Sequence, residues 1–274
     1  SWENCWLQNY SFATRSNPFG GRSTLNKQLI NVMQDYGNIP SLRNYVLTKE
    51  NKDTQALEKA GLEWARISEK NHLSYEIDWL GVPVIQTPED LVLLQELIFE
   101  IQPDVIVELG IAHGGGMIFE ASLLEMLGKG KVIGIEIEIR EHNRKVLEAH
   151  PLAKRIEMIE GSSIADDVVR EVEKRIPEHS KVIVCLDSNH TKPHVLQELQ
   201  IYQKFVPVGC YMVVFDTLAS DLAKMKASRE IYIDNGPGEA VYEFLQKTND
   251  FKIDKRFNKL YSSHNRDGYL KRVA

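Results

Sequence analysis

The sequence predicts an α/β fold, built on a mostly parallel sheet of seven strands with helices on both faces. From residue 88 onward, short apolar runs alternate with stretches of helical spacing. Strands separated by helices of about 10–15 residues are typical of βαβ units. A glycine-rich turn follows the first strand, at 110–116, and three of the apolar runs end in an acid. Acids at the carboxyl ends of parallel strands lie where such folds bind ligands.

Each element of this core follows from a local pattern. The first helix begins at Pro88, because proline is favoured in the first helical turn and the acids Glu89 and Asp90 complement the helix dipole. The expected strands are 105–107, 131–136, 156–160, 182–186 and 211–215. The expected helices are 88–101, a helix from the glycine turn through 127, and 140–149, 164–176, 193–205 and 239–248. The segments 250–257 and 268–273 are expected to pair as antiparallel edge strands.

Residues 1–75 are expected to form a helical and loop extension, followed by the core at 76–274. Helical spacing occurs at 24–36 and at 53–70. One face of the second helix is predicted to consist of Leu57, Ala60, Gly61 and Trp64. Aromatic residues near the start of the chain are compatible with self-association into a homo-oligomer.

Composition narrows the class of function. The net charge of −6 and the pI near 5.8 argue against a general nucleic-acid binder. No stretch approaches the roughly 18 apolar residues of a membrane span, and the first residues do not have the pattern of a signal peptide. Cys185 and Cys210 lie in or beside predicted strands, where a free cysteine acts as a small hydrophobic group. A cytoplasmic protein that acts on a small molecule, with no nucleic-acid or membrane partner, is expected.

The turn at 110–116 favours a nucleoside ligand that carries a methionine. Glycine lets a ligand approach the backbone, and the spacing places Gly110 and Gly114 in the turn. The spacing Gly-x-x-x-Gly-Gly-Gly differs from the Gly-x-Gly-x-x-Gly of dinucleotide folds. Glu136 ends the next strand as a candidate for a ribose diol, 26 residues after Gly110 rather than about 20. Both differences argue against a nicotinamide oxidoreductase. In the favoured alternative, Glu108 is expected to contact the ammonium group of the methionine.

Ser162 and Ser163 end the third strand. Their small hydroxyl side chains are candidates for lining an adenine pocket. An N-cap of the following helix at either serine is an equally good interpretation.

Asp187 and Asp216 follow two apolar strands and are expected to supply oxygen ligands to Mg²⁺. Such a metal holds a substrate hydroxyl and favours its alkoxide. His190 lies three residues after Asp187, close enough to accept the proton as a general base. For any single one of these residues, an N-cap or a solvated loop acid is an alternative. His113 and His194 are expected to be structural.

Four spaced motifs resemble the cephalosporin hydroxylase / rhamnosyl O-methyltransferase family over roughly 75–273. The motifs are Trp79-x-Gly81 with Gln86-x-Pro88-x-Asp90, then Glu108-x-Gly110-x-x-x-Gly114-Gly115, then Asp187-x-x-His190, and Asp216. Trp79 itself is expected to be a packed aromatic rather than a cover over a ligand.

The resemblance implies the Rossmann-like fold of class I S-adenosylmethionine-dependent methyltransferases. It implies S-adenosylmethionine bound by the glycine turn and Glu136, with Asp187 counted among the residues near the donor. It also implies Mg²⁺ held by Asp187 and by an acid pair at 215–216, with a base at His190. This sequence has Phe215 where the family commonly has Glu.

The first hypothesis is therefore an O-methyltransferase that acts on a hydroxyl of a sugar or of a glycosylated natural product. A second keeps the fold and the donor without a metal, and Phe215 then lines an apolar acceptor pocket. A third is a non-catalytic subunit or a partner of a hydroxylase. Methyl transfer is favoured over hydroxylation because the fold supplies no obvious redox cofactor.

Overall fold

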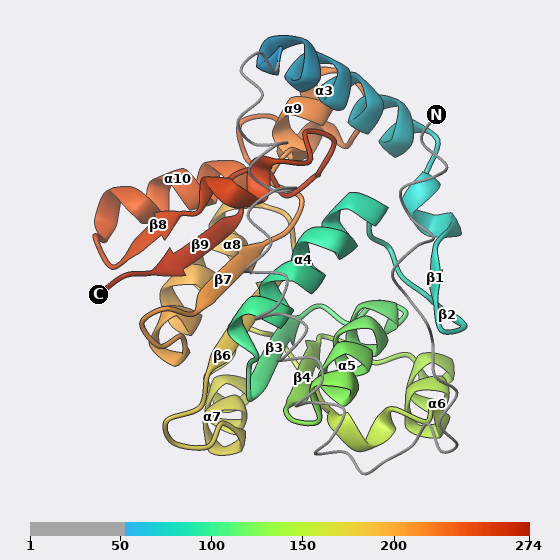
Figure 1. Cartoon of the computed structure of the whole chain (residues 1–274), viewed down its shortest axis with the longest axis vertical. Coiled ribbons are helices and arrows are strands. Elements are labelled where there is room, and N and C mark those ends of the chain that lie inside the picture. The colour runs from blue at the N-terminus through green and yellow to red at the C-terminus, as the bar shows by residue number, and fades with distance from the viewer. Residues whose placement is uncertain (1–52) are drawn as a thin grey trace, which may run out of the picture. The chain divides into compact units, whose positions relative to one another are not determined.

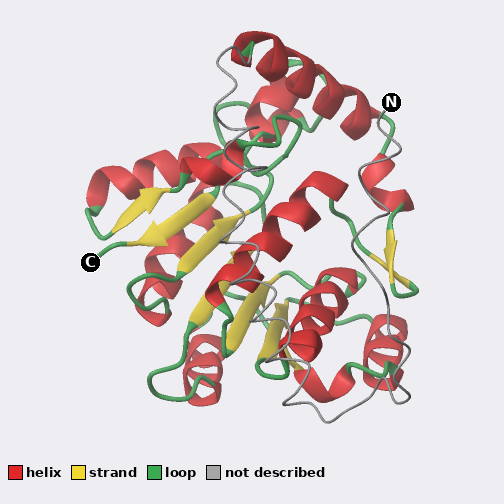
Figure 2. Cartoon of the chain, viewed as in Figure 1, coloured by secondary structure: helices red, strands yellow, loops and turns green. Residues whose placement is uncertain are grey.

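The computed structural model describes residues 53–274, and the structural statements below concern this part of the chain. Its centre is a seven-stranded sheet with helices on both faces (Figures 1 and 2). The strands of this sheet are β3 (Val105–Leu109), β4 (Lys131–Glu136), β5 (Ile156–Glu160), β6 (Val182–Leu186), β7 (Tyr211–Val214), β8 (Phe251–Ile253) and β9 (Tyr269–Arg272). Their spatial order is β5-β4-β3-β6-β7-β9-β8. The first five in this order are parallel, and β9 is antiparallel to both of its neighbours.

The helices are α3 (Thr54–Lys70), α4 (Pro88–Ile101), α5 (Gly115–Leu127), α6 (Glu141–Ala149), α7 (Asp166–Arg175), α8 (Lys192–Tyr202), α9 (Ala219–Lys224) and α10 (Pro237–Lys247). Short 3-10 turns are η2 (Leu73–Glu76), η3 (Ala153–Arg155), η4 (Gln203–Phe205), η5 (Glu230–Tyr232) and η6 (Lys255–Asn258). A small hairpin of β1 (Asp78–Trp79) and β2 (Val82–Pro83) precedes α4. The predicted α/β fold with its mostly parallel seven-stranded sheet is confirmed.

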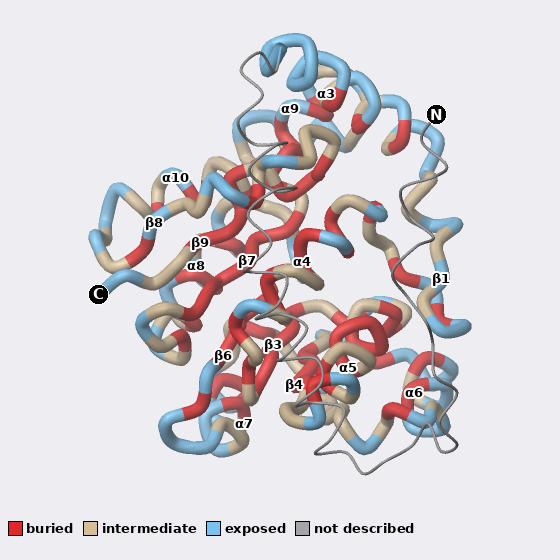
Figure 3. The backbone as a smooth tube through the Cα atoms, viewed as in Figure 1, coloured by how far each residue is buried: buried red, intermediate tan, exposed pale blue. Residues whose placement is uncertain are grey.

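The core lies on the central strands. Every residue of β3, β6 and β7 is buried (Figure 3). Helices cover both faces of these strands, so their sequences are continuous apolar runs rather than alternating ones. Cys185 and Cys210 are free and buried, as expected for small hydrophobic groups.

The buried face of α3 differs from the prediction. Gly61, Ala65 and Ser68 are buried, whereas Leu57 and Trp64 are 41% and 49% exposed and Ala60 is exposed as well. Small residues make the contact because the helix approaches another segment closely: a Cβ at Gly61 would lie 2.2 Å from the carbonyl oxygen of Tyr261. The expected helix at 24–36 lies outside the described residues.

Two further expectations need correction. The segments 250–257 and 268–273 pair as antiparallel strands, as expected, but of the two only β8 lies at an edge of the sheet, because β9 inserts between β7 and β8. The N-cap of α7 is Ala165, not Ser162 or Ser163, because the chain makes a turn in which the Ala165 amide donates to the Ser162 carbonyl before the helix begins. Among residues 53–274, no helix is both long and apolar enough to cross a membrane.

Candidate active site

The carboxyl edge of the sheet collects the acids that the sequence singled out. Glu108 lies in β3, Glu136 ends β4, Asp187 follows β6, and Asp216 lies two residues after β7. The strands β4, β3, β6 and β7 are consecutive neighbours in the sheet and run parallel. Their ends therefore open on one side, as parallel topology requires.

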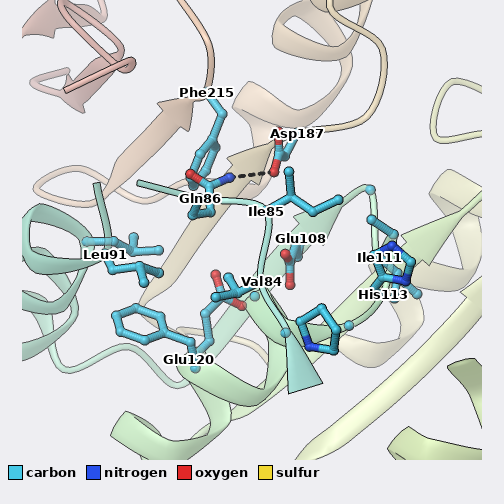
Figure 4. A pocket seen from close by; sticks show the side chains of 18 residues that line it. Val84, Ile85, Gln86, Leu91, Glu108, Ile111, His113, Glu120, Asp187 and Phe215 are labelled. Atoms are coloured by element: carbon cyan, nitrogen blue, oxygen red, sulfur yellow. Dashed lines mark hydrogen bonds between the residues drawn. The ribbon is translucent and has the colours of Figure 1, made fainter. Parts of the chain in front are cut away.

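Asp187, His190 and Asp216 form a compact group of possible metal ligands. One ligand atom from each lies within 4.8 Å of the others. The Nε2 atom of His190 is 3.5 Å from Oδ2 of Asp216 and 3.9 Å from Oδ1 of Asp187. The Gln86 amide donates a 2.8 Å hydrogen bond to Oδ2 of Asp187, which fixes this carboxyl group (Figure 4). The Tyr232 ring meets the His190 ring edge-on, with centroids 6.2 Å apart.

The position of Asp216 is set by the loop before β9. Its backbone is left-handed, with φ of 53°, a conformation that Asp tolerates better than most residues. The Asp216 amide donates to Oδ1 of Asn265 at 2.8 Å, and Nδ1 of His264 lies 3.8 Å from Oδ1 of Asp216. The His264 amide in turn donates to the buried Asp90 at 3.1 Å. Asn265 and His264 therefore hold the loop that carries Asp216.

The charges at this cluster are unevenly distributed. Burial, reinforced by the Asp216 carboxylate, raises the pKa of Asp187 well above its usual range. Burial opposes ionisation of Asp216 as well, but His190 and His264 outweigh it and lower the pKa of Asp216. Burial opposes the charged form of His264, while Asp216, Asp90 and Glu69 raise its pKa. A divalent cation between Asp187 and Asp216 would favour the ionised form of both.

Glu69 is a residue near this cluster that the sequence did not single out. It lies on α3, and burial followed by the Asp216 carboxylate raises its pKa, against the effect of His264 and His190. Since α3 belongs to the segment expected to be an extension, no strand-end pattern pointed to it.

The cluster fits a magnesium ion only in part. Its two carboxylates are hard oxygen donors of the kind that Mg²⁺ prefers. Gln86 donates its hydrogen bond to Oδ2 of Asp187, so this bond does not involve Oδ1 of the same carboxyl group. Phe215, which is 4% exposed, adds no third carboxylate from the end of β7. Asp187 and Asp216 would therefore hold the ion with help from the acceptor and water.

A pocket beside this cluster has the glycine turn as its floor. It is lined by Pro83, Val84, Ile85, Gln86, Leu91, Leu94, Glu108, Gly110, Ile111, Ala112, His113, Gly114, Gly115, Gly116, Phe119, Glu120, Asp187 and Phe215. Gly110 has φ of 104°, and a Cβ there would lie 2.2 Å from the Asp187 carbonyl oxygen, so only glycine fits. Gly114, with φ of 92°, is the N-cap of α5. His113, expected to be structural, faces this pocket (Figure 4).

Glu136 organises the turn from the neighbouring strand. Its Oε2 accepts hydrogen bonds from the amides of Ile111 and Ala112, at 2.9 and 3.0 Å. Its Oε1 accepts from the Ile137 amide at 3.0 Å. The Glu136 carboxylate thus lies against the glycine turn. The sequence analysis named this residue as the candidate that binds a ribose diol.

Glu108 and Glu120 form a buried acid pair in the wall of the pocket. They are 7% and 1% exposed, and both line this pocket. Burial raises the pKa of Glu108 well above its usual range, and Glu120 and Asp187 raise it further. Burial also raises the pKa of Glu120, to about 8. Within residues 53–274, Oε2 of each carboxyl group is buried without a hydrogen-bond partner.

A second polar cluster surrounds the fully buried Glu198 of α8. Its Oε1 accepts hydrogen bonds from Ser163 at 2.5 Å and Ser188 at 2.6 Å, and lies 3.2 Å from Nε2 of His194. Ser163 belongs to the loop after β5 and Ser188 to the loop after β6. Glu198 therefore connects the loop expected near adenine with the loop that carries Asp187. Within the described part of the chain, no side-chain hydrogen bond is seen for Ser162.

Trp79 is a packing residue, as expected. Its ring meets that of Phe119 edge-on at 4.9 Å, and its Nε1 donates to the hydroxyl of Ser122 at 3.1 Å.

Comparison with known proteins assigns this arrangement to a family. The model of the family described as rhamnosyl O-methyltransferase/CmcI matches residues 71–273. A rhamnosyl O-methyltransferase of Mycobacterium leprae (strain TN) is 28% identical over 141 residues, which are 51% of this chain and 59% of that protein. One of Mycobacterium bovis (strain BCG / Pasteur 1173P2) is 26% identical over 199 residues, 70% of this chain and 76% of that protein.

The fold likeness extends to a solved structure of CmcI described as its Mg-SAM form. The TM-score is 0.53 and the sequence identity 18%, and the likeness covers 73% of this chain and 78% of that chain. At this identity it establishes the shared fold.

Proposed function

Because the chain belongs to the rhamnosyl O-methyltransferase/CmcI family, we propose that it is an S-adenosylmethionine-dependent O-methyltransferase. The proposed acceptor is a hydroxyl of a sugar or of a glycosylated natural product. The observation that supports this most directly is the juxtaposition of the glycine-turn pocket with the Asp187, His190 and Asp216 cluster. A donor and an acceptor bound at these two places would be held side by side, and positioning supplies much of the catalysis of a bimolecular transfer.

The pocket residues are assigned to the donor. S-adenosylmethionine supplies an electrophilic methyl group when bound. Its ammonium group fits the unpartnered buried oxygen of Glu108, and the absence of a side chain at Gly116 leaves room beside that carboxylate, since a Cβ there would lie 2.4 Å from its Oε1. Glu136 is assigned to the ribose hydroxyls, and its hydrogen bonds to the Ile111 and Ala112 amides support this by holding its carboxylate against the glycine turn. Ser162 and Ser163 are assigned to the adenine side.

The strand-end cluster is assigned to the acceptor. Asp187 and Asp216 would hold Mg²⁺, whose charge lowers the pKa of a bound hydroxyl. His190 accepts the hydroxyl proton at Nε2, and the Asp216 carboxylate 3.5 Å away stabilises the resulting imidazolium. Gln86 keeps Asp187 oriented.

A small-molecule acceptor, a cytoplasmic location and self-association stay predictions.

One observation favours a second version of this function. Phe215 adds an apolar ring to the pocket lining where the family commonly offers a carboxylate. In this version the same fold methylates a less polar acceptor without a metal, and His190 alone accepts the proton.

Methyl transfer from isotopically labelled S-adenosylmethionine to rhamnosylated acceptors tests both versions. The variant His190→Ala is expected to lose about 10²–10⁴-fold in kcat while it retains S-adenosylhomocysteine binding, because it removes the base and leaves the donor pocket intact. Wild-type turnover in this variant would exclude His190 as the base. Full activity in EDTA would exclude the metal-dependent version, and no binding of S-adenosylhomocysteine to the wild type would exclude the proposed function.

A further inference from the structure

Glu120 is a buried acid that the proposed reaction does not yet use. It lies on α5 and faces the donor pocket together with Glu108 of β3 (Figure 4). Two carboxyl groups can hydrogen-bond to one another only if one of them carries a proton, because an ionised carboxylate has no donor. Glu108 and Glu120 are both buried and line the same pocket, so a proton on one that the other accepts relieves the repulsion between two ionised carboxylates.

Among residues 53–274, the pocket lining around the pair offers no lysine or arginine as a compensating cation. His113 is the only histidine of this lining, which consists entirely of described residues. The groups that face Glu108 from the neighbouring elements are Glu120, Asp187 and Glu136, and Cys185 faces Glu120. All of these raise the negative charge or leave it unchanged, so two ionised carboxylates would repel one another in a desolvated wall.

A ligand that brings a positive charge changes this balance. Each carboxyl group has one buried oxygen, Oε2, without a hydrogen-bond partner among the described residues. An ammonium group has three donors and one positive charge, which suits two acceptors of this kind. Such a group would replace the shared proton both as hydrogen-bond donor and as counter-charge.

We propose that Glu108 and Glu120 form a proton-linked receptor for the ammonium group of the methyl donor. In the free protein the pair holds one proton, and binding of the ammonium group releases this proton to the solvent. Glu120 is a binding residue that contacts the ammonium group beside Glu108, and the inference rests on the proposed function for the identity of the donor. No covalent bond other than one carboxyl O–H changes.

The electrostatics of the pair agree with this geometry. Burial raises the pKa of both carboxyl groups, and that of Glu120 to about 8, so the pair retains a proton at neutral pH. Because the two groups titrate together, the proton belongs to the pair.

Calorimetry in buffers of different ionisation enthalpy tests the proposal at pH 7. S-adenosylhomocysteine carries the ammonium group, whereas methylthioadenosine has the same nucleoside without the amino-acid part. Binding of S-adenosylhomocysteine is expected to release about one proton per protein chain, since one of the two carboxyl groups is neutral beforehand. Binding of methylthioadenosine is expected to release none.

Two variants separate the pair from the rest of the fold. Glu120→Gln keeps the size and a hydrogen-bond donor but removes one of the two titrating groups, so S-adenosylhomocysteine binding should release fewer protons than it does from the wild type. Unchanged methylthioadenosine binding shows that this variant is folded. Glu198→Gln changes a buried acid outside the pocket lining and should keep the wild-type proton count.

The outcomes distinguish the inference from the proposed function. If both ligands bind the wild type without proton release, or if Glu120→Gln releases as many protons as the wild type, the inference is overturned and the proposed function stands. If neither ligand binds, the proposed function is overturned and the inference with it.

Discussion

At the scale of single residues, Glu120 shows how much a buried charge depends on its surroundings. It is flanked on α5 by Met117, Phe119 and Ala121, all buried. The folded protein binds a proton at Glu120 more tightly than the unfolded chain does, because burial raises the pKa from 4.5 to about 8. Stability must therefore fall as the pH rises through this interval.

Glu120→Gln is expected to remove this loss of stability with rising pH. Between pH 5 and pH 8, the free energy of unfolding of the wild type should fall relative to that of the variant, with a limiting slope of about 1.4 kcal/mol per pH unit for one proton. Urea unfolding across this range measures the difference. The control is Glu138→Gln at an exposed position, which should run parallel to the wild type. A constant difference between Glu120→Gln and the wild type would contradict the raised pKa.

The sequence predicted the site residues unevenly. Asp187, His190 and Asp216 were predictable as a group because apolar runs mark strands, and parallel strand ends meet at one edge. Asn265 and His264, which fix Asp216, lie in an irregular loop near β9 where no periodicity applies. Glu120 could have been found from the sequence as an acid among the apolar residues of a predicted helix.

At the scale of elements, α3 docks through small residues. A Cβ at Gly61 would come within 2.2 Å of the backbone oxygen of Tyr261, and backbone atoms cannot move aside cheaply. The same helix carries Glu69, which faces the strand-end cluster. The predicted buried face included the large residues Leu57 and Trp64, and this was wrong. Helical spacing shows that a segment is a helix, but it does not show which of its faces packs against the rest of the protein.

Gly61→Ala tests this contact. Helix propensity alone would stabilise α3 by about 1 kcal/mol, since alanine is the better helix former. We expect a net loss of about 1–3 kcal/mol in the free energy of unfolding, because overpacking against backbone outweighs propensity. Chemical denaturation measures it, with Glu58→Ala on the exposed side of α3 as control. A stabilised Gly61→Ala protein would show that the contact relaxes without cost.

Glu198 links two loops that leave different strands. Glu198→Ala would leave the hydroxyls of Ser163 and Ser188 without this acceptor, and because Ser163 is buried, a loss of about 1–3 kcal/mol in stability is expected. Glu198→Gln, which keeps a carbonyl acceptor, should lose less. Thermal unfolding compares the two, and equal losses would indicate that the charge of Glu198, rather than its hydrogen bonds, matters.

At the scale of the whole molecule, the fold was predictable because each level of the sequence agreed with it. Apolar runs, glycine turns and helix starts all indicated the same alternation, and the strands occur where these patterns place them. The insertion of β9 between β7 and β8 was not predictable from local patterns, because strand order depends on long-range pairing. The small hairpin of β1 and β2 and the short helix α9 were missed for a related reason, since two to six residues carry too little periodicity.

The carboxyl edge also gives the molecule a lopsided electric field. Asp216, whose pKa is lowered, and Glu136 lie there in a protein of net charge −6. Such a field steers a cationic ligand towards the edge, and salt screens it. Stopped-flow binding should therefore show an association rate for S-adenosylmethionine that falls several-fold from low to high salt. The rate for S-adenosylhomocysteine should fall less, and equal salt dependence would count against steering.

Turnover would benefit from the same asymmetry. S-adenosylmethionine carries a sulfonium charge that S-adenosylhomocysteine lacks, so the attraction that accelerates arrival of the donor weakens once its methyl group has left. The spent molecule would then be exchanged for a fresh one without any movement of the protein. An acidic edge of this kind would help to distinguish substrate from product by charge.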